Sequence, residues 1–425
     1  MFGRPLVRDY TDVAELVGLC DINPARLKLA QAQLGGNIPG FTDFDEMLDK
    51  VDCDAVIVTT PCGTHHQFII KALERGLDVI SEKAMTVDAE KVRAILEAER
   101  KSTGTLKVTF NYRYVPYVTE IKRLLREGVI GDIQSVELHW FLDTLHGADY
   151  FRRWHRRKEN SGGLLVHKAT HHFDLVNWWI DADPLTVFAM GSRFFYGPTR
   201  EKRGERCLTC KYKDSCEFYM DLTEHKSYAK LYLAAEQYDG YYRDRCIFSP
   251  EINIEDTMHV MARYSKGIQF SYTLTAYSPF EGWRLVINGN KGRLEASEPH
   301  SFIPEEAPDF ATRTKSKQLI DAWEAARGNM EPEKEGLIII YPLFGGVKVH
   351  RVPKATGGHG GGDERLRDML FRTGTPDPLG HAAGSRAGAM SVLLGAAANE
   401  SIATGQPVSI PGLLGAELSA ALGLE

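Results

Sequence analysis

The sequence predicts an α/β fold: a Rossmann-type doubly wound parallel sheet followed by an α+β domain with a large, mainly antiparallel sheet. Strand and helix patterns alternate over about the first hundred residues, which is typical of right-handed βαβ units. Beyond Tyr114 the strands are longer and alternate apolar with polar residues, as antiparallel strands do. The length of 425 residues is too great for one ordinary domain. We therefore expect a first domain over residues 1–114 and a second over residues 115–425.

The first domain is expected to contain four short strands separated by helices. Proline near a helix start and glycine after a helix end mark these boundaries. The expected strands are ELVGLCD (15–21), DAVIVTTP (54–61), DVISEKA (78–84) and LKVTFNYR (106–113), and the helices are NPARLKLAQAQLG (23–35), HQFIIKALERG (66–76) and DAEKVRAILEAERKSTG (88–104).

The second domain is expected to alternate helices with long antiparallel strands. Lys-Gly and Asn-Gly pairs indicate hairpin turns within two of the strand ranges. Helices are predicted at 118–131, from Leu164 onward and at 382–405, strands at 133–143, 259–277 and 283–297, and a polar, cysteine-rich insertion at about 200–250.

The composition excludes several classes of protein. A net charge of −6 gives no reason to expect nucleic acid or an anionic membrane as partner. No apolar run is long enough to span a membrane, and MFGRPLVRDY has no signal-peptide core. The odd number of cysteines, 7, indicates a reducing compartment rather than a disulfide framework. We expect a cytoplasmic protein, although an export signal encoded upstream of Met1 would change that expectation.

A polar stripe runs along the otherwise apolar segment SGGLLVHKATHHFDLVNWW (161–179). His167, His171, Asp174 and Trp178 recur at spacings of four, three and four, so a continuous helix would place them on one face. Three interpretations are open: core histidines with satisfied hydrogen bonds, a metal site, or proton transfer by a histidine that titrates near neutral pH. HKATH has the spacing of a zincin helix, but Lys168 replaces the glutamate that such a site needs as its base.

Three segments together resemble one family. TTPCGTHHQFIIKALERGLDVISEKAM (59–85), VTFNYRYVPYVTEIKRLLREGVIGDIQSVE (108–137) and SGGLLVHKATHHFD (161–174) are similar, in order and spacing, to motifs of the Gfo/Idh/MocA family of nicotinamide-dependent oxidoreductases. The resemblance covers most of the chain and is best between residues 15 and 174. It implies a first domain that binds NAD(P) and a second that carries the substrate.

The resemblance also implies roles for individual residues. The cofactor-binding residues would be Asp21, Thr60, Pro61, His65, Glu82, Lys83 and Asn111. Asp21 would hold the adenosine ribose, which favours NAD, while Arg26 lies close enough in sequence to keep NADP open. Lys83 and His171 would be catalytic, with His167 beside them in place of the family's aspartate. Arg113, Asp174 and His172 would face the substrate.

Four features depart from the family pattern. Ala84 replaces the motif proline, His167 replaces an aspartate, and Cys62 stands where asparagine is common. No Gly-x-Gly-x-x-Gly precedes Asp21, and only eighteen positions separate Gly3 from it, fewer than the fingerprint needs. We therefore expect the first strand and its glycine loop to be missing from the sheet, and an N-terminal extension in the functional protein.

Two further segments leave alternatives open. Cys207, Cys210, Cys216 and Cys246 form a pattern that suits a structural zinc ion, with His225 as a substitute ligand, or they are free thiols. In the glycine-rich loop at 356–362, His359 would close the substrate pocket, or the loop is plain and Asp363 caps the helix that follows.

The combined prediction is hydride transfer between a nicotinamide and a secondary hydroxyl of a sugar, cyclitol or glycoside. The aromatic residues Trp140, Phe141, Tyr150 and Trp154 would suit a sugar ring or the core. The alternatives are an NAD-dependent glycoside-cleaving enzyme and a non-catalytic protein that binds dinucleotide or sugar. The large sheet of the second domain suggests a homo-oligomer.

Overall fold

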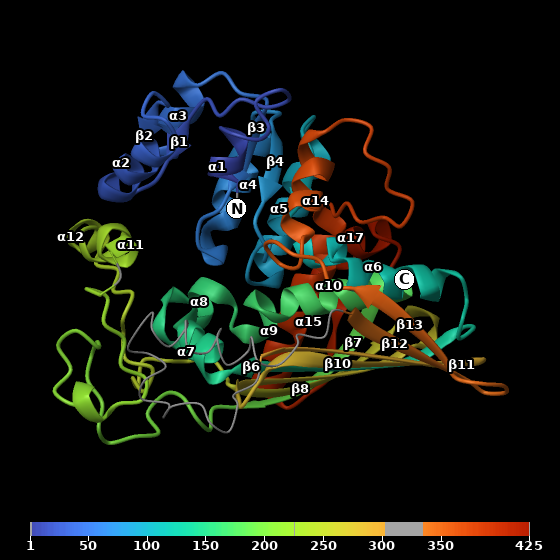
Figure 1. Ribbon diagram of the computed structural model, residues 1–425. Coiled ribbons are helices and arrows are strands. Elements are labelled where there is room, and N and C mark those ends of the chain that lie inside the picture. Colours follow the sequence, from blue (N-terminus) through green and yellow to red (C-terminus); the bar gives the residue numbers. More distant parts are fainter. Residues whose placement is uncertain (1, 225, 302–334, 425) are drawn as a thin grey trace.

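Two sheet-based parts stack one above the other, with the chain crossing between them near residue 114 (Figure 1). The computed structural model describes residues 2–224, 226–301 and 335–424. Short parallel strands with their helices form the first part, and a broad nine-stranded sheet forms the floor of the second. Parallel Rossmann-like pairing followed by a mainly antiparallel sheet confirms the predicted fold class. None of the described helices is both long and apolar enough to cross a membrane.

The elements of the first part follow the predicted strand and helix alternation. Asn23, Asp43 and Asp88 each cap the helix that follows by accepting backbone N–H groups, which is the ordinary role of these residue types. The elements are α1 (Gly3–Leu6), β1 (Leu19–Cys20), α2 (Pro24–Gln33), β2 (Gly40–Phe41), α3 (Phe44–Lys50), β3 (Ala55–Val58), α4 (His65–Glu74), β4 (Asp78–Ser81), α5 (Ala89–Lys101) and β5 (Leu106–Val108).

The parallel strands of the first part form two separate sheets. β1 pairs with β2, whereas β3, β4 and β5 form a three-stranded sheet. The Rossmann order 3-2-1-4-5-6 places its first strand between these two groups, and in the described residues no strand occupies that place. This agrees with the sequence, in which no glycine fingerprint precedes Asp21. Phe2, Leu6 and Tyr10 instead form a small apolar cluster with Ile80 of β4.

The second part is built on one nine-stranded sheet with the order β13-β12-β11-β10-β6-β9-β8-β7-β14. All neighbouring strands are antiparallel except β6 and β9. The strands are β6 (Ile133–Asp143), β7 (Pro184–Ser192), β8 (Thr257–Tyr264), β9 (Gln269–Ser278), β10 (Glu281–Gly289), β11 (Gly292–Ser301), β12 (Glu335–Pro342), β13 (Lys348–Pro353) and β14 (Val408–Ser409).

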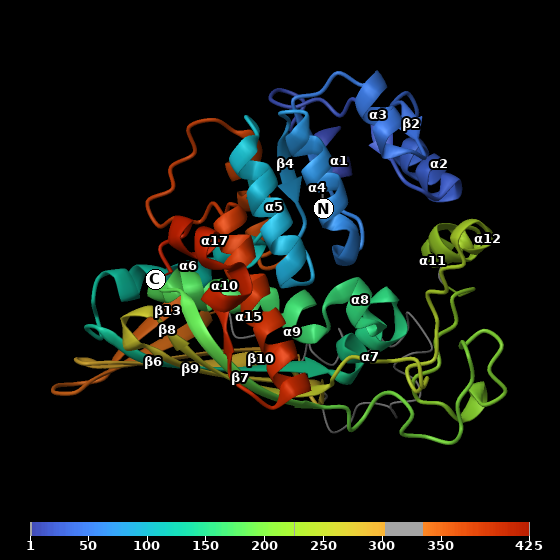
Figure 2. The ribbon, with the colours of Figure 1, turned by 180° about the vertical axis from the view of Figure 1, so that it is seen from behind.

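Most helices of the second part lie over one face of this sheet, as both ribbon views show, whereas those of the insertion do not (Figures 1 and 2). Alternate residues of β8 are buried and exposed, which is the period expected of a sheet with one packed face. The helices are α6 (Pro116–Arg126), α7 (Thr144–Arg152), α8 (Lys158–Ser161), α9 (Leu164–His167), α10 (Ala169–Ile180), α11 (Lys226–Tyr228), α12 (Glu236–Asp239), α14 (Gly362–Phe371), α15 (Ser385–Thr404), α16 (Ile410–Leu414) and α17 (Ala416–Ala421).

Helix α15 packs against both parts of the molecule. A Cβ atom at Gly395 would lie 2.3 Å from the carbonyl oxygen of Leu165 in α9, and one at Gly388 would lie 2.8 Å from the sulfur of Met85 in the first part. Glycine at both positions therefore allows the close approach. Just before α15, the Ala383 carbonyl accepts the N–H of Val108, so residue 383 extends the edge of β5.

The cysteine-rich insertion extends from the second part of the molecule and contacts the first. In both ribbon views α11 and α12 lie next to α2 (Figures 1 and 2). The side-chain amide of Asn23 donates to the Ala235 carbonyl at 3.0 Å, and Arg26 forms an ion pair with Asp239. The insertion therefore connects the two parts on the side where β1 ends.

Candidate active site

The helix predicted from Leu164 is in fact two helices that meet at Lys168. α9 ends at His167 and α10 begins at Ala169, and the His171 N–H bonds to the Lys168 carbonyl rather than to that of His167. The predicted helix is thus interrupted at Lys168, although this residue keeps right-handed helical dihedral angles. His167, Lys168 and His171 are all buried around this junction.

Lys83 of the first part and His167 of the second meet across the space between the two parts. The Lys83 ammonium donates to the His167 carbonyl oxygen at 3.2 Å. The thiol of Cys62 lies 3.3 Å from Nδ1 of His167. Two of the departures from the family pattern, Cys62 and His167, are thus direct neighbours. Burial raises the pKa of Cys62 to about 11, so its thiol stays protonated near neutral pH.

His171 lies beside this pair with one ring nitrogen that has no partner. Its Nδ1 is buried without a hydrogen bond within the described chain, and its ring packs against those of Phe110 and Tyr112. Burial holds the pKa of His171 well below its ordinary value, and the charge of Lys83 lowers it further. A neutral imidazole with a free nitrogen is able to accept a proton.

Burial lowers the pKa of the Lys83 ammonium too, while the Glu82 carboxylate opposes that shift. Burial raises the pKa of Glu82, whose carboxylate accepts the Lys83 backbone N–H at 3.3 Å. A lysine with a lowered pKa suits proton exchange near neutral pH. The Lys83–Ala84 peptide bond is cis.

Lys168 is a site residue that the sequence analysis set aside as evidence against a zincin. Its side chain is buried, with Nζ 5.4 Å from the ring centre of Trp140 and 5.9 Å from that of Tyr112. Burial lowers its pKa to about 8, against the opposing charge of Glu281. Lys168 precedes His171 by three residues, about one helical turn, and its charge lowers the pKa of His171.

Arg113 and Asp174, expected to face the substrate, bond to each other. Arg113 donates to the two carboxylate oxygens of Asp174 at 2.8 and 2.5 Å, and both side chains are buried. A third bond runs from Arg113 to the Gly380 carbonyl. This geometry ties α10 to the segment after β5 and leaves the Asp174 carboxylate with no exposed oxygen to offer a ligand.

His172 is likewise built into the core. Its Nδ1 lies 2.7 Å from the Tyr272 hydroxyl, and its ring stacks on Trp140 with centroids 3.6 Å apart. Trp140 itself is 1% exposed, so its ring is core rather than a platform for a sugar. His155, which the sequence analysis missed, is also buried, and its ring centroid lies 4.2 Å from that of His167.

The residues after β3 form a rigid turn around His65. The two ring nitrogens of His65 lie 2.9 Å from the Ala84 carbonyl and 2.6 Å from that of Thr60, and burial lowers its pKa to about 4. The side chain thereby holds the Thr60–Pro61 turn beside the residues that follow β4. Its place in the structure is to position that turn rather than to project into open space.

The residues expected to hold a dinucleotide lie at the carboxyl ends of the parallel strands. In open α/β sheets this edge is where ligands bind. Asp21 follows β1 and accepts the Asn23 N–H at 2.8 Å. Asn111 follows β5, and its buried Oδ1 has no partner in the described part of the chain. An exposed carboxylate at one end and an unpartnered amide oxygen at the other fit the ribose and nicotinamide ends of such a cofactor.

The glycine-rich loop before α14 closes on Asn111. The Asp363 carboxylate accepts the Asn111 amide at 2.7 Å and lies 3.0 Å from Nδ1 of His359. Asp363 does not cap α14, since Gly361 occupies that position. The His359 ring is 5.6 Å from that of Tyr112, so His359 lies at the edge of the site.

The zinc interpretation of the cysteine cluster is not supported. Within residues 2–224, 226–301 and 335–424, no group of three or more His, Cys, Asp or Glu is arranged to hold a metal ion, and all seven cysteines are free thiols. Cys207 accepts a hydrogen bond from Arg152 at 3.0 Å. His225 lies outside the described residues.

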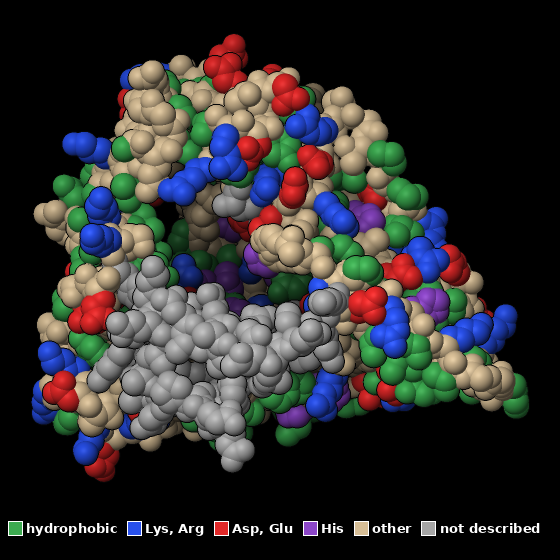
Figure 3. All heavy atoms as spheres, in the orientation of Figure 1, with side chains coloured by type: hydrophobic (Ala, Val, Ile, Leu, Met, Phe, Trp, Pro, Cys, Tyr) green, Lys and Arg blue, Asp and Glu red, His purple; other side chains and the backbone are tan. Residues whose placement is uncertain are grey.

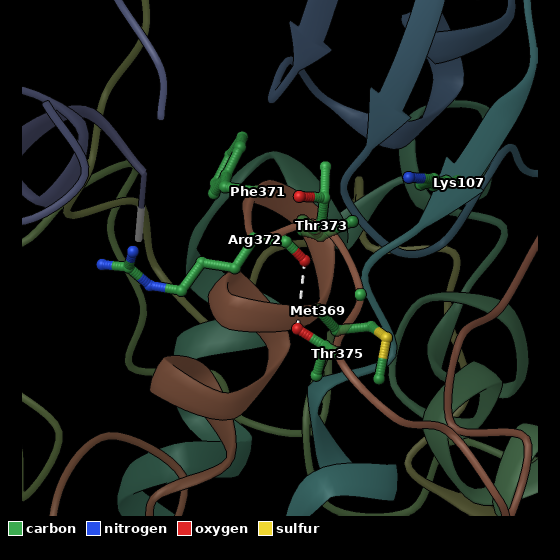
Figure 4. Close-up of a pocket in the computed structure, with 8 residues that line it drawn as sticks. Lys107, Met369, Phe371, Arg372, Thr373 and Thr375 are labelled. Carbon is green, nitrogen blue, oxygen red and sulfur yellow. Dashed lines mark hydrogen bonds between the residues drawn. The ribbon is translucent and has the colours of Figure 1, made fainter. Parts of the chain in front are cut away.

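The space-filling view shows a hollow between the first part and helices α8 and α9, with Lys or Arg and His side chains inside it (Figure 3). A different cavity, lined by Lys107 and residues 369–375, lies between β5 and the end of α14 (Figure 4). Within its lining, the Thr375 hydroxyl donates to the Arg372 carbonyl. It contains none of the residues described above.

Comparison with known proteins assigns both parts to one family. Residues 1–110 match the NAD-binding Rossmann fold of the oxidoreductase family GFO_IDH_MocA, and residues 122–410 match its C-terminal alpha/beta domain. The chain is 39% identical to the putative oxidoreductase YteT of Bacillus subtilis over 96% of this chain and 94% of that protein.

Solved structures share the fold. The WlbA dehydrogenase of Bordetella pertussis, in complex with NADH and UDP-GlcNAcA, superposes with a TM-score of 0.61 at 19% identity, over 96% of this chain and 93% of that one. A levoglucosan dehydrogenase in complex with NADH and levoglucosan gives 0.62 at 18% identity, over 93% and 90%.

Proposed function

Because the chain belongs to the GFO_IDH_MocA oxidoreductase family, we propose that it oxidises a secondary hydroxyl of a sugar, cyclitol or glycoside with NAD. When bound, the nicotinamide accepts a hydride from the carbinol carbon. The hydroxyl proton must leave at the same time, so that the alcohol becomes a ketone. The observation that carries the proposal is the meeting of Lys83 with His167 and His171 between the two parts.

Proton removal falls to His171 in this proposal. Its unpartnered Nδ1 and lowered pKa keep the ring neutral near pH 7. The Lys83 ammonium would donate to the substrate oxygen and favour its deprotonation. Lys168 would hold a second substrate oxygen, because its buried ammonium lies beside the rings of Tyr112 and Trp140 and acts on His171 in the same cluster.

The surroundings of Asp21 support NAD rather than NADP. Arg26, which kept NADP open at the sequence level, is 3.5 Å from the Asp21 carboxylate and is paired with Asp239 as well. A 2′-phosphate would therefore meet two carboxylates, and the single guanidinium between them is already neutralised. The insertion supplies the second of these carboxylates.

A substrate screen tests the proposed function. We expect the protein to form NADH with at least one member of a panel of polyols, cyclitols and glycosides, followed by NADH absorbance. Formation of a cleaved glycoside without net NADH would favour the glycoside-cleaving alternative instead. Binding of NAD with no turnover on any panel member would favour a non-catalytic binder.

We also propose that the bare face of the large sheet joins copies of the chain. Met190 and Met261 are each 66% exposed on this face, and Phe188 lies opposite Met261 on adjacent strands. Large exposed apolar side chains clustered on one face are typical of an interface. Light scattering after gel filtration should give a multimer, and Met261→Asp should shift it to a smaller species.

A further inference from the structure

Two arginines beside the candidate active site share a single carboxylate. Arg153 donates to Asp149 at 3.2 Å and Arg243 donates to its other oxygen at 2.5 Å. The Arg243 side chain is 5% exposed, yet its Nε and Nη1 have no partner within the described residues, nor has Nε of Arg153. One carboxylate balances only one of the two guanidinium charges, and a buried unpaired charge is costly.

These arginines border the catalytic cluster. Asp149 and Tyr150 are neighbours on α7, and the Tyr150 ring lies 5.7 Å from that of His167 and 5.3 Å from that of His155. The Arg153 side chain remains 31% exposed, so part of its guanidinium group or stem is open to solvent. Its charge acts on Lys83 and His167, whose pKa values it helps to lower.

Arg243 belongs to the insertion, and other residues of the insertion also hold its side chain. Its guanidinium packs over the rings of Tyr228 and Tyr232, with centroids at 5.5 and 5.7 Å. Tyr232 belongs to the insertion segment whose neighbour Ala235 bonds to Asn23. The guanidinium is therefore fixed in place rather than free to turn toward solvent, which lowers the entropic cost of binding a ligand there.

The surrounding charges do not cancel that of the two arginines. The ammonium groups of Lys83 and Lys168 are each opposed by a carboxylate, Glu82 for the first and Glu281 for the second, so the second guanidinium beside Asp149 stays unbalanced. A neutral sugar would leave this excess of positive charge without a counterpart. Guanidinium groups with free N–H donors match the planar oxygens of a carboxylate and those of a phosphate.

We propose that Arg153 and Arg243 form an anion subsite and that the substrate is a sugar or cyclitol derivative bearing a carboxylate or a phosphate. The anionic group would bind the free N–H donors of the two arginines, while the hydroxyl to be oxidised reaches Lys83 and His171. The proposal rests on the proposed function for the identity of the sugar moiety, but the subsite itself is testable by binding alone.

The test measures equilibrium binding by calorimetry, with NADH present, of D-glucuronate, D-galacturonate and D-glucose 6-phosphate against D-glucose and D-galactose. We expect at least one anionic sugar to bind about tenfold or more tightly than its neutral parent, with the difference shrinking as salt is raised. The better of uronate and phosphate identifies the anionic group. Equal binding of acids and parents, or no binding by any of them, would overturn the proposal.

Variants localise the effect. Arg243→Gln and Arg153→Gln should each remove most of the acid preference and leave the affinity for NADH unchanged. Arg157→Gln is the matched control, since Arg157 lies in the same segment but is paired with Glu159. A weakened NADH affinity with an intact acid preference would assign these arginines to the cofactor and overturn the proposal. Should the glutamine variants fail to fold, the proposal is tested instead by the acid preference of Arg243→Lys and by the salt dependence of anionic-sugar binding to the wild type.

Failure of this inference and failure of the proposed function give different results. If an acid binds tightly but never reduces NAD, the result supports the subsite and contradicts the proposed dehydrogenase function. Turnover of neutral sugars with no advantage for acids would keep the dehydrogenase function and remove the subsite.

Discussion

The Nζ atom of Lys83 lies 3.2 Å from the main-chain carbonyl oxygen of His167. This bond joins the residues that follow β4 to the end of α9, and it aims the ammonium at the break where Lys168 and His171 also project. A carbonyl acceptor leaves further N–H groups of the ammonium available to a substrate oxygen.

Loss of the Lys83 ammonium should reduce turnover without removing the fold. Lys83→Ala is expected to lower kcat by about 10²–10⁴-fold, the usual range for a group that takes part in proton transfer. Initial rates of NADH formation on the best substrate measure this. Lys50→Ala, on an exposed helix surface, is the control. Wild-type kcat in Lys83→Ala would contradict the assigned role.

Lys168 is expected to act on substrate binding rather than on chemistry. Lys168→Met keeps the length and apolar contacts of the side chain against Trp140 but removes its charge, so KM for the substrate should rise about tenfold while kcat changes little. The same kinetic assay separates the two parameters. A loss confined to kcat would instead make Lys168 part of the proton relay.

The buried histidines should make the protein less stable in mild acid. Burial holds the pKa of His155, His167, His171 and His172 well below the ordinary value. Below about pH 6.5 the unfolded chain therefore binds more protons than the folded one, and stability falls as the pH falls, by up to about 1.4 kcal/mol per pH unit for each histidine.

Urea denaturation at pH 7 and pH 5 measures this dependence. His172→Gln retains a polar group near the Tyr272 hydroxyl. In this variant the loss of unfolding free energy between pH 7 and pH 5 should be smaller by roughly the contribution of one histidine. An unchanged slope in this variant would show that His172 is not buried in its neutral form.

The pair of Arg113 and Asp174 should behave as a structural bond. Asp174→Ala leaves a buried guanidinium without its carboxylate and is expected to cost about 3–5 kcal/mol of unfolding free energy. The double variant Arg113→Leu with Asp174→Leu should recover part of that loss, because no unpaired charge remains. Chemical denaturation gives both values. If Asp174→Ala were as stable as wild type and only KM changed, Asp174 would be a substrate ligand after all.

The close contact between α15 and α9 leaves no room for a methyl group at position 395. Gly395→Ala would place its Cβ 2.3 Å from the Leu165 carbonyl oxygen and should destabilise the fold by about 1–3 kcal/mol. Because α9 ends at His167, we also expect a lower kcat. Thermal unfolding and the kinetic assay report the two effects, with Ala403→Ser, exposed on the same helix, as the control.

The sequence predicted the elements well wherever a local signal was strong. β6 occupies the predicted range 133–143, and α15 lies within 382–405, because an alternating strand and a capped helix each carry their own period. ELVGLCD, in contrast, is a strand only at Leu19–Cys20. A strand pairs along its length only where a neighbour exists, and β1 pairs with nothing but the two residues of β2.

The site was predictable in its membership but not in its pairings. Lys83 bonds to the His167 carbonyl oxygen, while the roles of Lys83, His167 and His171 stay predictions. The bond between Arg113 and Asp174, the contact of Cys62 with His167 and the bridge from Asn111 to Asp363 all join residues far apart in sequence. Such pairings depend on how the two parts pack, which no local pattern encodes.

The contact of residue 383 with the edge of β5 bears on how the chain is made. The first part of the molecule acquires one of its edge partners only after residue 383 has left the ribosome, so the nascent dinucleotide-binding part must wait, with that edge open, through the synthesis of nearly the whole polypeptide. If residues 1–114 were joined to another catalytic domain, β5 would lose its bond to residue 383. The two segments would therefore have to be exchanged together.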